Sequence, residues 1–192
     1  MDSVQDPLSD LVAACQNGDE TAFRTLVEKT QEDVYNLAYH MLGNTQEAED
    51  MTQEVYLRVW RGLPDFRSEA KFTTWLYSIT TNVCLNRRRH FGRRLRVVDD
   101  EDALEDSMAE YGDPAEATMR REERAILWKT VKYLPAKYRT VIDLFYQKQL
   151  SYQEIAELLS IPLGTVKGHL NRARKALAKR LRLKEEVPSA FL

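Results

Sequence analysis

The chain has 192 residues, with few glycines (7) and prolines (6) and a net charge of −2 at pH 7. This composition excludes collagen-like and Pro/Gly-rich disordered proteins. The absence of any run of 18 apolar residues and the polar start MDSVQDPLSD predict neither a membrane span nor a signal peptide. Cys15 and Cys84 lie far apart in apolar helical patterns, which favours reduced core thiols in an intracellular protein. The three histidines are scattered, so no metal site is predicted.

Charge is segregated along the chain. The net charge is −8 over residues 1–86, +6 over 87–98, −9 over 99–118 and +9 over 119–192. A nearly neutral total made of such polarised blocks predicts two parts joined by a charged connector. The connector has few large apolar side chains, so burial cannot offset its ordering entropy. We therefore expect a flexible acidic linker.

Four helices are predicted in the first 90 residues from the spacing of apolar side chains. Their approximate ranges are 8–15, 19–43, 45–61 and 70–89. Asp19 and Thr45 are expected to be the N-caps of the second and third helices, and Gly43 is expected to end the second. Because no segment shows the two-residue alternation of a strand, the sequence predicts an all-α fold.

Residues 151–177, SYQEIAELLSIPLGTVKGHLNRARKAL, are the most informative segment. Ser151 and Glu154 can form a capping box, and Pro162 favours the start of a second helix after a short break. That second helix is expected to bury Val166, Leu170, Ala173 and Leu177. The pattern predicts a helix-turn-helix whose second helix enters the major groove of DNA. Two further helices are expected upstream, after Pro114 and after Pro135.

The exposed side of the second helix is basic, with seven bases and no acid from Lys167 to Arg182. A helical hairpin with a solvated basic face is the alternative, but the capped, proline-punctuated spacing favours DNA binding. Side chains near the start of a reading helix reach bases, and later ones reach phosphates. Base-edge or close-approach roles are predicted for Thr165, Lys167, Gly168, Asn171 and Arg172, and phosphate contacts for Arg174 and Lys175. His169 lies on the same side.

Five aromatic residues are concentrated in residues 60–77. Phe72 and Trp75 follow the apolar stripe of a predicted helix, which favours core packing. Phe66 instead lies in a predicted loop that also contains bases. These bases are Arg67 and Lys71. Aromatic faces beside bases suit unstacked single-stranded DNA, and such a loop can line a pocket for a flipped base.

Four blocks of the chain together resemble the extracytoplasmic-function (ECF) group of bacterial RNA polymerase sigma factors, within the sigma-70 family. The blocks are GDETAFRTLVEKTQEDVYNLAYHMLGN, QEAEDMTQEVYLRVWRGLPDF, KFTTWLYSITTNVCLNRRR and LPAKYRTVIDLFYQKQLSYQEIAELLSIPLGTVKGHLNRARKAL. The resemblance implies two small helical domains, sigma region 2 at 1–96 and sigma region 4 at 119–184. The flexible acidic linker is then 97–118, and residues 185–192 form a tail.

The resemblance implies a transcription initiation factor that brings polymerase core to promoters and helps melt them. It implies neither catalytic residues nor a cofactor. The helix at 48–60 is expected to dock on the clamp helices of the largest subunit through Asp50, Gln53, Glu54 and Arg58. A contact with the second-largest subunit, control by an anti-sigma factor and a cytoplasmic, nucleoid-associated location without membrane insertion are also implied.

Promoter contacts are implied at two places. The −10 element would be recognised and melted by Asp65, Phe66, Arg67, Lys71, Trp75, Asn82, Arg87 and Arg88. The −35 element would be read by the helix-turn-helix residues named above, His169 included. Ser78 and His169 stand where basic residues are common in the family, and Asn86 stands where Asp is common. These departures bear on the promoter sequence more than on the function.

The sequence also admits two other function classes. A helix-turn-helix regulator that binds duplex DNA alone accounts equally well for residues 119–184, but it leaves the aromatic loop and the acidic linker unexplained. A recombinase-like enzyme needs a nucleophilic Ser or Tyr near bases, or carboxylates arranged for a metal ion. Asp99, Asp100 and Asp102 lie in a flexible run instead of on a shaped scaffold. Tight, specific duplex binding without polymerase would favour the simple regulator.

Overall fold

In the computed structural model, residues 7–94 and 127–185 are described, and the chain divides into two compact units, Met1–Val98 and Asp99–Leu192. Both units are helical, and no strand occurs in the described ranges, which confirms the predicted all-α fold. No helix in these ranges is long and apolar enough to cross a bilayer. The predicted acidic linker, the helix start at Pro114 and almost all of the predicted tail lie outside the described residues.

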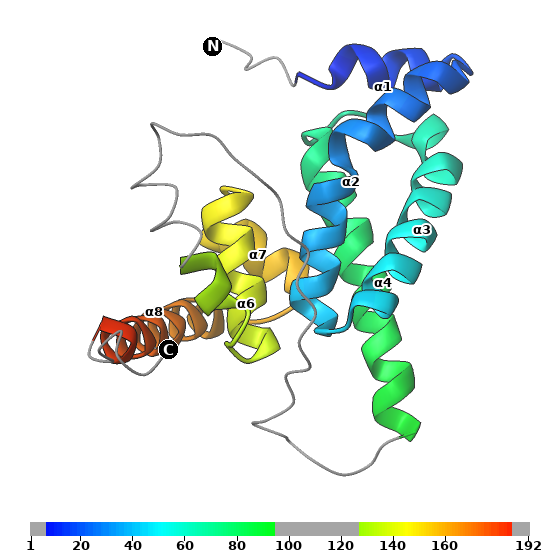
Figure 1. The fold of residues 1–192 in the computed structure, drawn as a ribbon. Helices are drawn as coiled ribbons and strands as arrows, with labels where there is room; N and C mark the ends of the chain where they lie inside the picture. Colours follow the sequence, from blue (N-terminus) through cyan, green and yellow to red (C-terminus); the bar gives the residue numbers. More distant parts are fainter. Residues whose placement is uncertain (1–6, 95–126, 186–192) are drawn as a thin grey trace, which may run out of the picture. The chain divides into compact units, whose positions relative to one another are not determined.

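The N-terminal unit consists of four α-helices and one short 3₁₀ helix. They are α1 (Ser9–Gln16), α2 (Glu20–Leu42), α3 (Thr45–Gly62), η1 (Leu63–Asp65) and α4 (Phe72–Arg94). The helices α2, α3 and α4 pack against one another, and α1 lies across one end of this group (Figure 1). The core that they share includes the fully buried side chains of Leu26, Val55, Val59 and Leu76.

Helix ends in this unit follow local capping chemistry. The Asp19 carboxylate accepts hydrogen bonds from the backbone N–H groups of Thr21 and Ala22 at 2.8 and 3.0 Å, as predicted. Gly43 ends α2 in the left-handed region, at φ +76°. The prediction for the third helix was wrong by one residue, because Asn44 is its N-cap instead of Thr45. The Asn44 side-chain oxygen accepts from the N–H of Glu47 at 2.9 Å.

Both cysteines are free and buried, in agreement with the prediction of core thiols. Cys15 belongs to the inner face of α1, and Cys84 lies on α4. Burial raises the pKa of the Cys84 thiol to about 12, and it also raises the pKa of Cys15. At neutral pH both thiols are therefore mostly protonated, the form that is the weaker nucleophile.

The C-terminal unit begins, within the described residues, with a helical stretch at 127–131. It continues with α6 (Ala136–Ile142), the π-helical turn η2 (Asp143–Gln147), α7 (Tyr152–Leu159) and α8 (Leu163–Glu185). The helix predicted after Pro135 therefore forms, but it widens into a π-helical turn where a continuous α-helix was expected.

The helix-turn-helix prediction is confirmed by α7 and α8. Ser151 and Glu154 form the capping box: the Ser151 N–H donates to Glu154 Oε2 at 2.7 Å, and the Glu154 N–H donates to Ser151 Oγ at 3.2 Å. Ser160, at φ +53°, ends α7 and starts the turn. The predicted apolar stripe of α8 is buried at all four positions, Val166, Leu170, Ala173 and Leu177.

Candidate functional site

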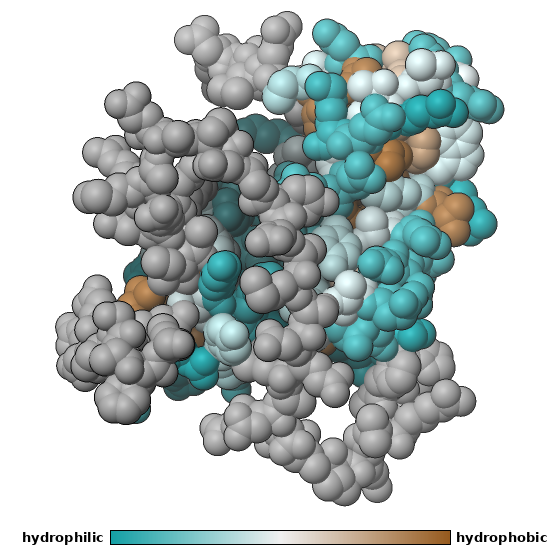
Figure 2. Space-filling model, in the orientation of Figure 1, coloured by the Kyte–Doolittle hydropathy of each residue, from teal (hydrophilic) through white to brown (hydrophobic). Residues whose placement is uncertain are grey.

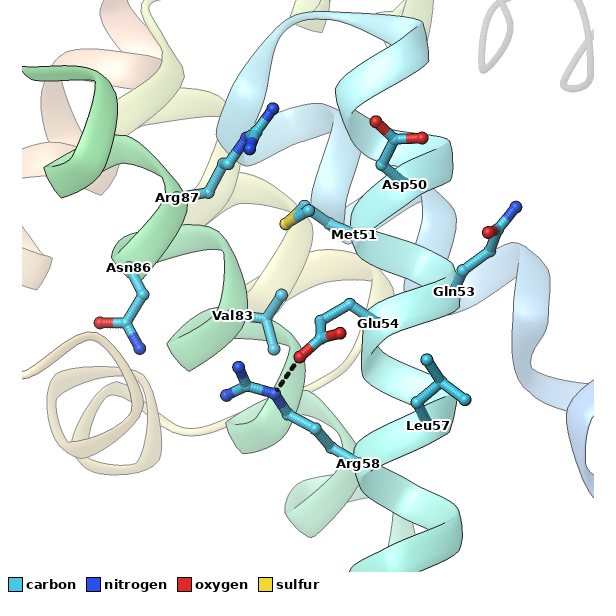
Figure 3. A pocket seen from close by; sticks show the side chains of 9 residues that line it. All are labelled: Asp50, Met51, Gln53, Glu54, Leu57, Arg58, Val83, Asn86 and Arg87. Atoms are coloured by element: carbon cyan, nitrogen blue, oxygen red, sulfur yellow. Dashed lines mark hydrogen bonds and ion pairs between the residues drawn. The ribbon is translucent and has the colours of Figure 1, made fainter. Parts of the chain in front are cut away.

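A groove of about 450 Å³ lies between α3 and α4 of the N-terminal unit (Figure 3). Both helices supply its walls, and α3 supplies most of the polar groups. All four residues predicted to bind polymerase core line this groove, together with Arg87, which was predicted as a −10 contact, and four other side chains. The lining residues are Asp50, Met51, Gln53, Glu54, Leu57, Arg58, Val83, Asn86 and Arg87. The α3 helix thus brings the predicted core-binding residues to one face.

The two arginines of the groove are paired with glutamates of α3. Arg58 Nε donates to Glu54 Oε1 at 2.7 Å, and both side chains are substantially exposed. An exposed pair of this kind contributes only about 0.3–0.5 kcal/mol, so both groups can exchange partners at low cost. Arg87 on α4 forms an ion pair with Glu47 of α3 at 3.5 Å. Arg87 therefore lies with the predicted core-binding residues, although the sequence analysis placed it among the −10 contacts.

Sequence reasoning missed the apolar part of this surface. Leu57 is 53% exposed and Trp60 is 43% exposed, which makes them the large exposed hydrophobic residues of α3. Figure 2 shows a small hydrophobic spot at the edge of the N-terminal unit, within a mainly hydrophilic surface. The sequence pattern could have indicated this apolar surface, because Leu57 and Trp60 fall outside the buried stripe of α3. That stripe contains Val55 and Val59.

The segment 63–71, here called the Phe66 loop, connects α3 to α4 and starts with η1. Its predicted −10 residues Asp65, Arg67 and Lys71 are exposed. Phe66 was expected to stand apart from the core, and the structure corrects this. The Phe66 ring is half-buried, and its centroid lies 4.9 Å from that of Trp75 and 6.0 Å from that of Phe72.

The three aromatic rings have different exposures. Phe72 is buried in the core, as predicted, and Trp75 is half-buried. Asn82 is exposed and follows Trp75 by seven residues, so both lie on the same side of α4. Arg88 is also exposed on α4. Further along α4, the Phe66–Trp75 ring pair is therefore followed by the exposed polar side chains of Asn82 and Arg88.

The predicted reading helix, α8, presents polar side chains on the side opposite its buried stripe. Lys167, Asn171, Arg172 and Lys175 are exposed, and Thr165 is half-buried near the start of the helix. A Cβ atom placed on Gly168 would meet nothing within 4 Å. Packing within the described part of the chain therefore does not require glycine at this position, and the space above the backbone is open to a partner.

His169 has a different environment from its neighbours on α8. Its ring is half-buried and lies edge-on to Tyr138 of α6, with 5.6 Å between the ring centroids. Burial lowers the pKa of His169, and the nearby charges of Lys137 and Arg172 lower it further. The imidazole is therefore neutral at pH 7, and His169 adds no positive charge to the reading face.

Arg174 connects α8 to the π-helical turn. Its Nε donates to the hydroxyl oxygen of Tyr146 at 2.9 Å. The guanidinium also lies 5.9 Å from the centroid of the Phe145 ring and 5.8 Å from that of Tyr146. The residue predicted as a phosphate contact thus has a partner within its own unit, although it stays largely exposed.

A metal centre is not formed by the residues in the described ranges, which contain no suitable group of three or more His, Cys, Asp and Glu side chains. The described candidate surfaces are thus the α3–α4 groove, the Phe66 loop with the start of α4, and the exposed face of α8.

Comparison with known proteins matches each unit to a family. Residues 26–94 match Sigma-70 region 2, and residues 124–177 match Sigma-70, region 4. The matched segments contain all of the residues named above for the three candidate surfaces.

Relatives of similar length support the same assignment. The chain is 38% identical over 174 residues to the ECF RNA polymerase sigma factor SigW of Bacillus subtilis (strain 168), which covers 87% of this chain and 92% of the relative. It is 34% identical over 174 residues to the ECF RNA polymerase sigma-E factor of Escherichia coli (strain K12), covering 87% and 90%.

Two solved structures share the fold. The sigma factor RpoE from Bartonella quintana, solved with the anti-sigma factor NepR, has a TM-score of 0.62 at 22% identity and covers 83% of this chain and 96% of its own. CnrH, solved with the cytosolic domain of CnrY, has a TM-score of 0.57 at 24% identity and covers 90% and 96%. At these identities the similarity concerns the fold.

Proposed function

Because this chain belongs to the ECF RNA polymerase sigma factors of the sigma-70 family, we propose a division of its work between the two units. The N-terminal unit binds polymerase core and opens the −10 element, and the C-terminal unit reads the −35 element. The observation that carries the core-binding part is the gathering of Asp50, Gln53, Glu54 and Arg58 in one groove. The proposed domains are 1–96 and 119–184, joined by the linker 97–118.

In this proposal, initiation needs no catalysis by the sigma factor itself and no cofactor. Melting draws its free energy from binding, because stacked flipped bases and phosphate contacts offset the stacking that the duplex loses. The Phe66 loop and the exposed Asn82 and Arg88 supply contacts to the −10 strand. On α8, contacts to the −35 duplex come from the exposed side chains of Lys167, Asn171, Arg172 and Lys175. The proposed location of the protein is the cytoplasm, on the nucleoid when it is active.

Control by an anti-sigma protein is part of the same proposal. The Bartonella quintana protein that shares this fold was solved with an anti-sigma factor. In the present chain, Leu57 and Trp60 expose apolar surface on α3 beside the groove proposed for polymerase. An inhibitor that covers this surface would exclude polymerase core by competition for the same residues.

Gel filtration with bacterial RNA polymerase core, followed by run-off transcription, tests the proposal. We expect the chain to co-elute with core and to direct transcripts from specific promoters. On its own, the chain should bind duplex promoter DNA weakly, since residues 1–86 carry a net charge of −8. No complex with core, alongside a control sigma factor that does bind, together with tight binding to duplex DNA, would show a stand-alone regulator instead.

Phe66→Ala is expected to reduce transcription from a duplex promoter by about 5- to 150-fold, because loss of one stacked base costs roughly 1–3 kcal/mol. Affinity for polymerase core should stay unchanged, since Phe66 lies outside the groove residues. Run-off transcription and core binding, measured in parallel, check both parts.

A second variant separates stacking from packing at this position, because the Phe66 ring also contacts Trp75. Phe66→Leu keeps apolar volume but removes the aromatic face. If promoter opening is normal in Phe66→Leu, or if Phe66→Ala loses core binding, then Phe66 is a packing residue and not a DNA contact.

Arg172→Ala is expected to weaken use of a promoter by about 1–3 kcal/mol if the side chain contacts a base edge. The change should not affect stability, because the side chain is exposed. The measurement is holoenzyme binding to a promoter with its natural −35 element and to one with that element scrambled. Lys179→Ala, an exposed base further along α8, is the matched control. Equal promoter use by Arg172→Ala and the unaltered protein would remove Arg172 from the site.

A further inference from the structure

Gln16, the last residue of α1, ties that helix to the start of the Phe66 loop. Its Nε2 donates to the carbonyl oxygen of Leu63 at 3.0 Å and to the carbonyl oxygen of Phe66 at 2.7 Å. These two acceptors are 47 and 50 residues further along the chain. One side-chain amide thus uses both of its N–H donors to hold the first residue of η1 and the residue that directly follows η1.

The turn held by Gln16 precedes the most exposed part of the loop. The Phe66 N–H also donates to the Leu63 carbonyl, at 3.1 Å, which closes the 3₁₀ turn. Directly afterwards, residues 67–71 are exposed, and Ser68 adopts a positive φ of +54°. Gln16 therefore binds the backbone directly before the exposed residues 67–71, and its two hydrogen bonds hold the backbone that carries the Phe66 ring.

The position of Gln16 is itself fixed by the core. Leu8, Val12 and Cys15 are buried among the core side chains, so α1 is anchored along its inner face. The helix lies before residues 26–94, which match Sigma-70 region 2, so that match assigns it no role. We propose that Gln16 is a positioning residue for the Phe66 loop, and this rests on the proposed function of the loop in reading the −10 strand.

The proposed role requires two donors on one side chain. Gln16→Met keeps a similar length but has no donor, and Gln16→Glu places a carboxylate, which cannot donate, against two carbonyl oxygens. Asn17→Ala is the matched control. Asn17 is the next residue and is also exposed, but its Nδ2 donates to the Ala13 carbonyl within α1, at 2.9 Å.

The test uses the full chain assembled with polymerase core and fluorescent single strands that carry the non-template −10 sequence of a promoter that this holoenzyme transcribes. Each base is replaced in turn by an abasic site. The Kd for the abasic strand divided by the Kd for the intact strand measures how strongly the holoenzyme discriminates in favour of that base. Loss of two hydrogen bonds should raise the Kd of Gln16→Met and Gln16→Glu for the intact strand by about fivefold. The discrimination of both variants should fall as well. Asn17→Ala should keep the strand Kd and the discrimination of the unaltered protein, and no variant should change in its affinity for core.

Three outcomes would overturn the inference. Unchanged discrimination in Gln16→Met, with discrimination lost in Phe66→Ala, refutes the role of Gln16 and leaves the proposed function standing. Unchanged discrimination in Phe66→Ala as well shows that the loop does not read the strand, so both proposals fail. Reduced affinity for core in Gln16→Met shows that the residue supports the whole unit instead of the loop.

Discussion

Leu57→Asp should lower the affinity of this sigma factor for polymerase core by about 2–4 kcal/mol, the cost of removing a central residue of a protein interface. Leu57 is 53% exposed and lines the α3–α4 groove beside Gln53 and Glu54. In a complex, the new carboxylate would lose its hydration at a position where Leu57 offers apolar surface. Co-elution with core at micromolar concentration, and titration of labelled protein with core, measure the loss.

The fold should survive this change because the Leu57 side chain is largely in solvent. Leu57→Met, which conserves volume and polarity, is the control and should bind core nearly as well as the unaltered protein. The helix signal in circular dichroism and the melting temperature should be the same for all three proteins. Normal assembly of Leu57→Asp with core would exclude this part of α3 from the polymerase-binding surface.

Leu170→Ala should destabilise the C-terminal unit by about 2–5 kcal/mol, since it leaves a cavity at a fully buried position. Leu170 is 1% exposed on the inner face of α8, next in the stripe after Val166. A loss of this size is a large fraction of the stability of a small domain, which is about 5–15 kcal/mol. Transcription that depends on the −35 element should fall, while binding to core through the α3–α4 groove should persist.

Amide hydrogen exchange can show whether the loss of stability is confined to the C-terminal unit. Amides of α7 and α8 should exchange faster in Leu170→Ala, and those of α2 and α3 should keep the protection that they have in the unaltered protein. Lys179→Ala changes an exposed residue on the same helix and should stay within about 0.5 kcal/mol of the unaltered protein. Equal exchange in Leu170→Ala and Lys179→Ala would contradict the assignment of Leu170 to the core of the helix-turn-helix.

The features that could be predicted from the sequence are those encoded by neighbouring residues. The Ser151–Glu154 capping box and the Asp19 cap depend on side chains within three residues of the groups that they bind. The helical spacing of Val166 and Leu170 likewise reports a buried stripe directly. Local chemistry of this kind places helix ends to within about one residue, as the cap of α3 at Asn44 instead of Thr45 illustrates.

The features that could not be predicted depend on residues that are distant along the chain. Phe66 looks like an isolated loop aromatic until α4 places Trp75 against it. Arg87 looks like one more arginine of a basic run until α3 places Glu47 beside it. His169 looks like one more polar residue of α8 until burial, together with the charges of Lys137 and Arg172, lowers its pKa. Composition and spacing carry no information about such pairs, since tertiary packing decides them.

The buried thiols have a practical consequence for attaching dyes to the two units. Maleimide dyes react with thiolates, and at neutral pH a thiol with a pKa of about 12, such as that of Cys84, offers almost none. Cys15 is also buried, and burial raises its pKa as well. A pair of cysteines engineered on exposed positions of α3 and α8 should therefore take up donor and acceptor dyes selectively in the otherwise unaltered chain. Energy transfer between them would follow inhibitor release and promoter engagement in single molecules.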